Sequence, residues 1–165
     1  MSEKKYILSK EQVARKIQRL AFEIAERNAG EKELFFIAIK ENGVTLAHKI
    51  SQALKTIADI PLHVLELSLD KRHPKEINIS NMPSQEGAVI ILIDDVASSG
   101  KTMMYALKPL MEIYPKKIQT LVLVERTHKA FPVQIDYVGM SVATTLEEHI
   151  YVEVANGEIN GAYMD

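Results

Sequence analysis

The stretch VIILIDDVASSGKT (residues 89–102) joins an unbroken apolar run to a short polar tail. The apolar part predicts a strand over residues 88–93 that is buried on both faces, which is typical of a central strand in a parallel sheet. Two acids, Asp94 and Asp95, follow directly, and small residues then lead to a helix expected to begin near Thr102. Because a tight loop and a helix N-terminus expose successive backbone N–H groups, this stretch predicts an anion site.

The end of the stretch looks like an ATP-binding P-loop, but the complete motif does not fit. A P-loop needs a glycine five positions before Gly100 so that the loop can wrap a chain of phosphates. Asp95 occupies that position, and its carboxylate would repel a triphosphate. The sequence therefore argues against an ATPase and favours a single phosphate, with hydroxyl donors from Ser98, Ser99 and Thr102.

The two acids suit a sugar attached to that phosphate. Vicinal hydroxyls are donors, and paired carboxylates accept hydrogen bonds from them well. A ribose 5-phosphate would place its phosphate in the loop and its 2- and 3-hydroxyls on Asp94 and Asp95. For either acid alone, the simpler alternative is a strand-end residue that caps the following turn. The whole string favours the sugar phosphate.

The flanking sequence predicts an α/β fold with a doubly wound, mainly parallel sheet flanked by helices. Helices are expected over residues 10–28, with Ser9 as N-cap and Gly30 after the end, over 47–57, and over 103–111, where Pro109 should kink or shorten the last one. Buried or alternating strands are expected over residues 33–39, 62–69, 88–93 and 118–125, with more exposed, antiparallel strands added late in VQIDYVG and HIYVEV. The polar segment 70–85 predicts a loop or a flexible hairpin. Residues 1–165 are expected to form one domain.

The composition excludes several classes of function. The 165 residues are 47% hydrophobic and 25% charged, with a formal net charge of -2 and no long Lys/Arg run, so a general attraction to polyanions is not expected. The absence of cysteine excludes disulfides, thiolate zinc sites and a cysteine nucleophile. No apolar run is long enough to span a membrane, so we expect a cytoplasmic protein.

With these residues in view, IILIDDVASSGKT resembles the phosphoribosyl pyrophosphate (PRPP) signature of type I phosphoribosyltransferases, departing only at Ser99, where threonine is usual. The resemblance implies that PRPP is bound by Asp94, Asp95, Val96, Ala97, Ser98, Ser99, Gly100, Lys101 and Thr102. It also implies Mg²⁺ as cofactor, placed by Asp94 and Asp95 directly or through water. The expected reaction transfers ribose 5-phosphate from PRPP to a nucleobase and releases pyrophosphate.

Two further segments are similar to the group of bifunctional pyrimidine operon regulators/uracil phosphoribosyltransferases. They are ILSKEQVARKIQRLAFEIAERN (residues 7–28) and LVLVERTHKAFPVQIDYVGMSVATT (residues 121–145). The group implies uracil or another pyrimidine as the base, and a homodimer or larger assembly. It also leaves open a nucleotide-sensing regulator, with RNA as a partner that the charge balance does not favour.

The base-binding residues expected from this resemblance are Ser98, Glu125 and Arg126. The related hypoxanthine-guanine branch has a lysine at position 125, which donates to the 6-oxo group of the purine, and an aspartate at position 98. Glu125 is an acceptor and Ser98 carries no charge, so both changes favour a pyrimidine. A 6-oxopurine phosphoribosyltransferase remains an alternative.

The sequence departs from the family pattern mainly in the segment that is expected to bind pyrophosphate. The pyrophosphate loop is expected at Lys40, Glu41, Asn42 and Gly43, where related sequences carry an arginine. The alternative is an ordinary strand-to-helix turn with Asn42 as N-cap and a permissive Gly43. Lys40 and Arg126 join Asp94 and Asp95 as the expected catalytic residues.

A flexible hood over PRPP is expected in LDKRHPKE (residues 69–76), with Lys71, Arg72 and His73 as its candidates.

Overall fold

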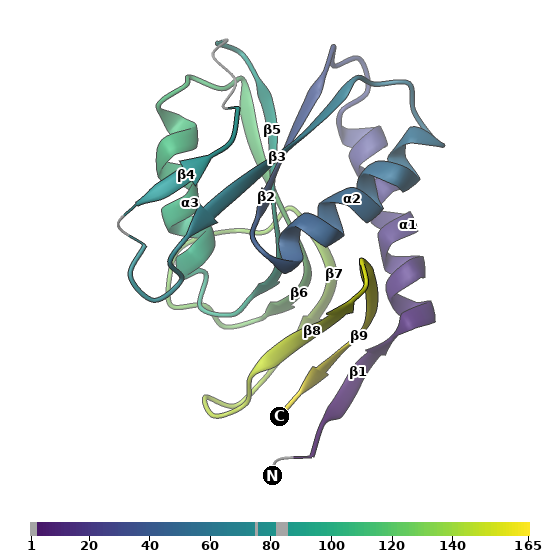
Figure 1. Cartoon of the computed structure of the whole chain (residues 1–165), viewed down its shortest axis with the longest axis vertical. Coiled ribbons are helices and arrows are strands. Elements are labelled where there is room, and N and C mark those ends of the chain that lie inside the picture. Colours follow the sequence, from purple (N-terminus) through teal and green to yellow (C-terminus); the bar gives the residue numbers. More distant parts are fainter. Residues whose placement is uncertain (1–2, 75, 82–85) are drawn as a thin grey trace.

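The computed structural model describes residues 3–74, 76–81 and 86–165, which build two sheets and three helices within that range (Figure 1). The elements in chain order are β1 (Lys5–Ser9), α1 (Lys10–Arg27), β2 (Leu34–Ile39), α2 (Asn42–Lys55), β3 (Leu62–Leu69), β4 (Ile77–Ile79), β5 (Val89–Ala97), α3 (Lys101–Met111), β6 (Lys117–Arg126), β7 (Tyr137–Val142), β8 (Ile150–Ala155) and β9 (Glu158–Met164).

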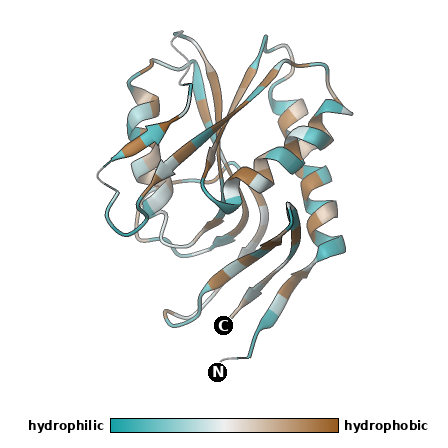
Figure 2. Ribbon diagram, viewed as in Figure 1, coloured by the Kyte–Doolittle hydropathy of each residue, from teal (hydrophilic) through white to brown (hydrophobic). Residues whose placement is uncertain are grey.

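The larger sheet has six strands in the order β4-β3-β2-β5-β6-β7. All its pairings are parallel except that of β4, which runs antiparallel to β3 at the edge. Strands β2, β5 and β6 are the apolar runs of the sequence, and they lie next to one another at the centre (Figure 2). The doubly wound α/β fold is therefore confirmed.

Helices cover both faces of this sheet because successive strand residues point to opposite sides. On one face, Phe36 of β2 and Ile91 of β5 pack with the apolar sides of α1 and α2. On the other face, Ile37 and Ile90 pack with α3. The buried positions of α1 recur at helical spacing, and Ser9 and Gln12 form a capping box at its start. Helix α3 contains Pro109 and ends at Met111, so the predicted short helix is confirmed.

The C-terminal part of the chain differs from the prediction. Strand β7 pairs in parallel with β6 and begins at Tyr137, which is fully buried, so the expectation of a more exposed, antiparallel strand here was wrong. Strands β8 and β9 instead form a separate three-stranded antiparallel sheet with β1, which brings the two ends of the chain together (Figure 1). Strand β1 was not predicted because its partner β9 lies at the other end of the chain, and β9 was not predicted although Asn156-Gly157, between it and β8, is a hairpin turn signal.

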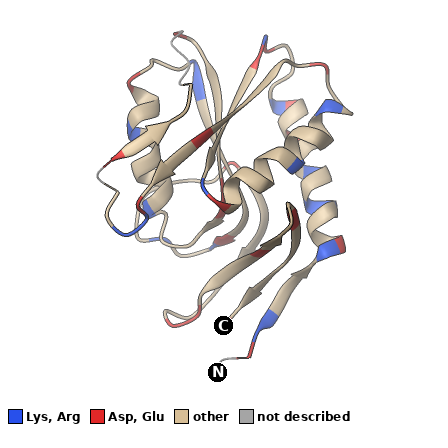
Figure 3. Cartoon of the chain, in the orientation of Figure 1, with Lys and Arg blue, Asp and Glu red and all other residues tan. Residues whose placement is uncertain are grey.

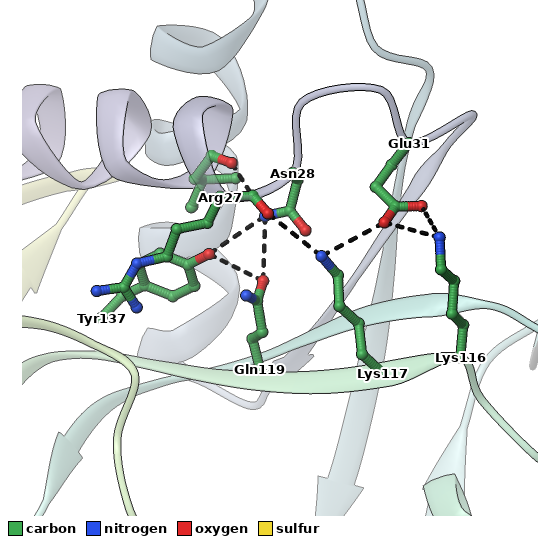
Figure 4. A network of polar contacts seen from close by, with 8 residues as sticks. Arg27, Asn28, Glu31, Lys116, Lys117, Gln119 and Tyr137 are labelled. Carbon is green, nitrogen blue, oxygen red and sulfur yellow. Dashed lines mark hydrogen bonds and ion pairs between the residues drawn. The ribbon is translucent and has the colours of Figure 1, made fainter.

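A polar network lies at the end of the large sheet where its parallel strands begin (Figure 4). The buried Asn28, just after α1, donates from Nδ2 to Gln119 Oε1 at 3.1 Å and to Tyr137 Oη at 3.2 Å. The Tyr137 hydroxyl donates to the same Gln119 oxygen at 2.8 Å. Lys116 Nζ lies 2.8 Å from a carboxylate oxygen of Glu31. These contacts tie the end of α1 to β6 and β7. Within the described ranges, no helix is long and apolar enough to cross a membrane.

Candidate functional site: a ribose-phosphate cavity at the ends of the strands

A cavity of about 270 Å³ opens at the carboxyl end of β5. It is lined by residues 94–103, by Asn42 and Lys71, and by residues 150–152 of β8. The structure thus brings all nine residues of the predicted PRPP-binding stretch to one cavity. Open α/β sheets bind ligands outside the carboxyl ends of their strands, and this cavity has that location.

The phosphate loop, residues 97–102, is held in a tight turn between β5 and α3. Gly100 has φ 82°, and a Cβ atom there would lie 2.7 Å from Val133 Cγ1, so this position requires glycine on two counts. The carbonyl of Ser99 accepts hydrogen bonds from the backbone N–H groups of Ala130 and Phe131, each at 3.0 Å. The start of α3 also lines the cavity, and a helix N-terminus favours anions, although the N–H of Lys101 already donates to Ser99 Oγ at 3.2 Å.

The two acids at the end of β5 are buried and held in place by backbone groups. Asp94 Oδ1 accepts the N–H of Asp95, and Asp95 Oδ1 accepts the N–H of Val96, both at 2.9 Å. Burial raises the pKa of Asp94 well above its ordinary value, and the neighbouring charge of Asp95 acts in the same direction. A ligand that donates hydrogen bonds or carries positive charge would favour the ionised form of Asp94.

The fit to magnesium follows from this pair of acids. Mg²⁺ is commonly held by one or two carboxylates together with phosphate oxygens of a substrate. Asp94 and Asp95 supply two such carboxylates, whereas the described residues contain no cluster of three His, Cys, Asp or Glu side chains able to hold a metal alone. The residues therefore fit a metal that arrives with a phosphorylated ligand.

The predicted pyrophosphate loop lies beside a second cavity, of about 480 Å³, lined by Lys40, Glu41, Asn42, Ser68, Leu69, Lys71 and Asp95. Lys40 does not present a free cation, since its Nζ lies 3.2 Å from Glu66 Oε2. The alternative in which Asn42 caps α2 is wrong: Glu41 is the N-cap residue and no side chain caps the helix.

Gly43 has a packing role in place of the permissive backbone role that the alternative gave it. A Cβ atom at this position would come within 2.9 Å of the carbonyl oxygen of Ile93. The start of α2 therefore approaches β5 closely because residue 43 is a glycine.

The hood candidates occupy the hairpin between β3 and β4, which confirms the hairpin interpretation for this part of segment 70–85; residues 75 and 82–85 lie outside the described ranges. Lys71 lines both cavities, and its Nζ lies 3.6 Å from Asp94 Oδ1. The backbone carbonyl of Arg72 accepts a hydrogen bond from Lys101 Nζ at 3.1 Å, which links the hairpin to the phosphate loop. His73 lines a different cavity near β4.

The expected base-binding residues are not all brought together. Ser98 lines the ribose-phosphate cavity, whereas Glu125 and Arg126, at the end of β6, are absent from its lining. Glu125 is engaged on both oxygens, by Ser141 Oγ at 2.9 Å and by Lys129 Nζ at 2.6 Å. Arg126 Nη2 donates to the carbonyl of Glu148 at 2.7 Å. In this arrangement neither side chain is directed at the ligand cavity, so their base contacts stay predictions.

Sequence reasoning missed the contribution of β8 to the site. Residues 150–152 line the same cavity as the phosphate loop, and the carbonyl of Val152 accepts a hydrogen bond from Asn42 Nδ2 at 3.2 Å. No motif marks these residues, because Asn42 and Val152 are 110 positions apart. The only local signal is the alternation of buried Ile150 and Val152, which indicates a strand and no ligand contact.

Comparison with known proteins agrees with this geometry. The sequence matches the phosphoribosyl transferase domain family over residues 4–155. It is 35% identical over 161 residues to the bifunctional protein pyrR of Enterococcus faecalis (strain ATCC 700802 / V583), covering 92% of this chain and 90% of the relative. It is 34% identical over 169 residues to bifunctional protein PyrR of Pelotomaculum thermopropionicum, covering 96% and 92% respectively.

Solved structures show the same fold at lower identity. A hypoxanthine-guanine phosphoribosyltransferase of Bacillus anthracis superposes with a TM-score of 0.73 at 19% identity, covering 86% of this chain and 84% of that one. The hypoxanthine phosphoribosyltransferase of Trypanosoma cruzi in complex with the product IMP gives 0.76 at 17% identity, covering 88% and 83%. On the sequence matches and the shared architecture, the chain belongs to the phosphoribosyltransferase family, within its PyrR-like group.

Proposed function

We propose that this phosphoribosyltransferase transfers ribose 5-phosphate from PRPP to a pyrimidine base, with uracil as the first candidate. The observation that carries the proposal is the single cavity that combines the phosphate loop with two buried acids. Such a cavity offers backbone donors to a phosphate and acceptors to sugar hydroxyls. The PyrR-like relatives and the uncharged Ser98 support a pyrimidine over a purine.

The mechanism rests on positioning and charge. The phosphate loop holds the 5-phosphate, and Asp94 and Asp95 hold the ribose hydroxyls, so C1 of the sugar lies where the two cavities meet. Negative charge grows on the departing pyrophosphate, and Lys71, on the wall shared by both cavities, is placed to stabilise it. Magnesium held by Asp94, Asp95 and the substrate oxygens would neutralise further charge on the pyrophosphate.

A second candidate function is a nucleotide-binding regulator with slow catalysis. The observation that favours it is the state of the two lysines beside the pyrophosphate subsite. Lys40 pairs with Glu66 and Lys71 approaches Asp94, so each cation has a carboxylate partner before any pyrophosphate arrives. RNA would need a local basic surface, and Figure 3 shows Lys and Arg spread over the ribbon together with Asp and Glu.

The test is a panel of bases, each mixed with PRPP and Mg²⁺, in which released pyrophosphate is measured. Turnover with uracil is the expected result. Turnover with hypoxanthine or guanine but not with uracil would contradict the pyrimidine assignment. Absence of turnover with every base, together with micromolar binding of nucleoside monophosphates, would establish the regulator in its place.

A further inference from the structure

Asn42 connects three parts of the site that lie far apart in sequence. It is the first residue of α2, at the predicted pyrophosphate loop. Its side-chain amide donates to Asp95 Oδ2 at 3.0 Å and to the carbonyl of Val152 at 3.2 Å. A side-chain amide has two N–H donors, and here one serves a ribose acid and the other serves the backbone of β8.

The backbone beneath Asn42 is held tightly, so the amide has a defined position. The next residue, Gly43, packs so closely on β5 that an added Cβ would lie 2.9 Å from the Ile93 carbonyl oxygen and 3.2 Å from Asp94 Cα. Helix α2 therefore begins directly against the strand that carries the acids. Its cap uses no side-chain hydrogen bond, so Asn42 is not needed for capping.

The two acceptors of this amide belong to different walls of the cavity. Asp95 and Asn42 both line the ribose-phosphate cavity and the second cavity beside the predicted pyrophosphate loop. Val152 belongs to β8, whose residues 150–152 line the ribose-phosphate cavity. A ligand that fills the space next to β8 and also reaches the acids would contact both elements that Asn42 joins.

We propose that Asn42 is a positioning residue that couples the base end of the ligand cavity to the ribose acids through β8 and Asp95. Contact between a base and β8 holds the Val152 carbonyl against the Asn42 amide, and the same amide holds Asp95 in the orientation that accepts a ribose hydroxyl. The inference rests on the proposed function for the identity of the ligand. It differs from the expectation that Asn42 contacts pyrophosphate, because both amide donors are already engaged inside the protein.

The test compares ligands that occupy one or both ends of the cavity, in binding experiments that need no turnover. Ribose 5-phosphate, uridine 5′-monophosphate, inosine 5′-monophosphate and PRPP are titrated by calorimetry into wild-type protein and into Asn42→Ala. We expect ribose 5-phosphate to bind about tenfold more weakly to the variant, because Asp95 loses one hydrogen bond to a charged group. The preferred nucleotide should lose about 30-fold or more, since the β8 wall is released as well.

Two further variants test this interpretation. Asn42→Asp keeps the size of the side chain but sets an acceptor against Asp95 and the Val152 carbonyl, so its nucleotide affinity should fall further than that of Asn42→Ala. Asn160→Ala, in β9 of the same small sheet, is the matched control and should bind all four ligands like wild type. Thermal unfolding of each variant shows whether a loss of affinity reflects a loss of folded protein.

The possible outcomes distinguish the proposed coupling from other roles of Asn42. Equal losses for ribose 5-phosphate and nucleotide would overturn the coupling, and so would a loss confined to PRPP, which would make Asn42 a pyrophosphate contact. Because the two nucleotides differ only in their base, an error in the base assignment appears as a preference for inosine 5′-monophosphate in the wild-type protein. Failure of the proposed function is therefore visible without the variants.

Discussion

Polar and charged side chains are arranged differently at the two ends of the large sheet. Where the strands begin, polar groups just after α1 and on or beside β6 and β7 pair with one another, as in the pairing of Glu31 with Lys116 and the contacts among Asn28, Gln119 and Tyr137, although the buried Asn28 Oδ1 has no hydrogen-bond partner among the described residues (Figure 4). Where the strands end, the carboxyl groups of Asp94 and Asp95 lie next to each other in a buried position, and burial raises the pKa of Asp94.

This difference indicates that one end of the sheet contributes mainly to stability and the other mainly to ligand binding. A network in which protein groups form hydrogen bonds and ion pairs with one another holds elements together but does not present those groups to a ligand. Adjacent buried acids lower the stability of the folded state, and a ligand that donates hydrogen bonds or positive charge relieves that loss. Substitutions at the first end should therefore destabilise the folded protein, whereas substitutions of the acids at the second end should weaken binding without such a loss of stability.

The largest expected effect is the loss of ligand affinity in Asp95→Asn. The amide keeps one acceptor oxygen but removes the charge, so hydrogen bonds from ribose hydroxyls weaken and PRPP should bind about 10- to 100-fold more weakly. Calorimetry with PRPP and Mg²⁺ measures the change, and thermal unfolding should show a folded variant. Unchanged PRPP affinity would remove Asp95 from the ribose site.

Tyr137→Phe tests the opposite end of the sheet. The substitution deletes a buried hydroxyl that donates to Gln119 and accepts from Asn28, so Gln119 Oε1 loses one of its two donors and Asn28 loses one of its acceptors. The free energy of unfolding should fall by about 1 to 2 kcal/mol, as urea denaturation would show, while the affinity for PRPP stays the same. A variant that keeps its stability but loses PRPP affinity would contradict the separation of the two ends.

Asp94→Asn should stabilise the protein while it impairs function. The pKa of Asp94 is raised in the folded state above its unfolded value of 3.8, mainly by burial. Protonated Asp94 therefore contributes stability that is complete below that unfolded value and is lost as the pH rises through the folded pKa. Each unit by which the pKa is raised corresponds to about 1.4 kcal/mol, so the advantage of the asparagine should grow with pH across this window.

Thermal unfolding of wild type and Asp94→Asn at several pH values measures this advantage. The matched control is Asp136→Asn, at the other end of the sheet, where the carboxylate accepts hydrogen bonds from Thr120 and the substitution should destabilise. An Asp94→Asn protein with the same pH dependence as wild type would show that Asp94 is not the group responsible.

The smallest expected effect belongs to Glu66→Gln. This change removes the carboxylate that pairs with Lys40 at 3.2 Å and frees the ammonium for pyrophosphate. Because both side chains are partly exposed, the gain should be modest, a two- to threefold decrease in KM for PRPP by about the magnitude of a surface ion pair. Glu33→Gln, which removes the partner of His63 at the other end of the sheet, is the control. A KM that rises would show that the pair itself positions Lys40.

Several features followed from the sequence because their causes are local. The apolar runs of β2, β5 and β6 predict buried parallel strands, the spacing of α1 predicts an amphipathic helix, and the string from Asp94 to Thr102 predicts a ribose-phosphate site. Each of these depends on residues within a single strand, loop or helix turn. Their physical reasons, burial, helical period and backbone donors, act over a few positions of the chain.

Other features were decided only by the tertiary structure, because their partners are distant in sequence. Strand β1 pairs with β9 and so joins the two ends of the chain, and no local pattern indicates a partner across that distance. The pairing of Lys40 with Glu66 depends on which side chains the fold brings within reach, so a charged residue in the sequence is not necessarily free to contact a ligand. In the sequence, Asn42 is a candidate helix cap, whereas in the structure its side chain donates hydrogen bonds to β5 and β8. By itself, the sequence determined the parallel strands at the centre of the sheet and predicted a sugar-phosphate site through contiguous residues, whereas the contribution of β8 to the cavity came from packing between segments that meet only in the folded chain.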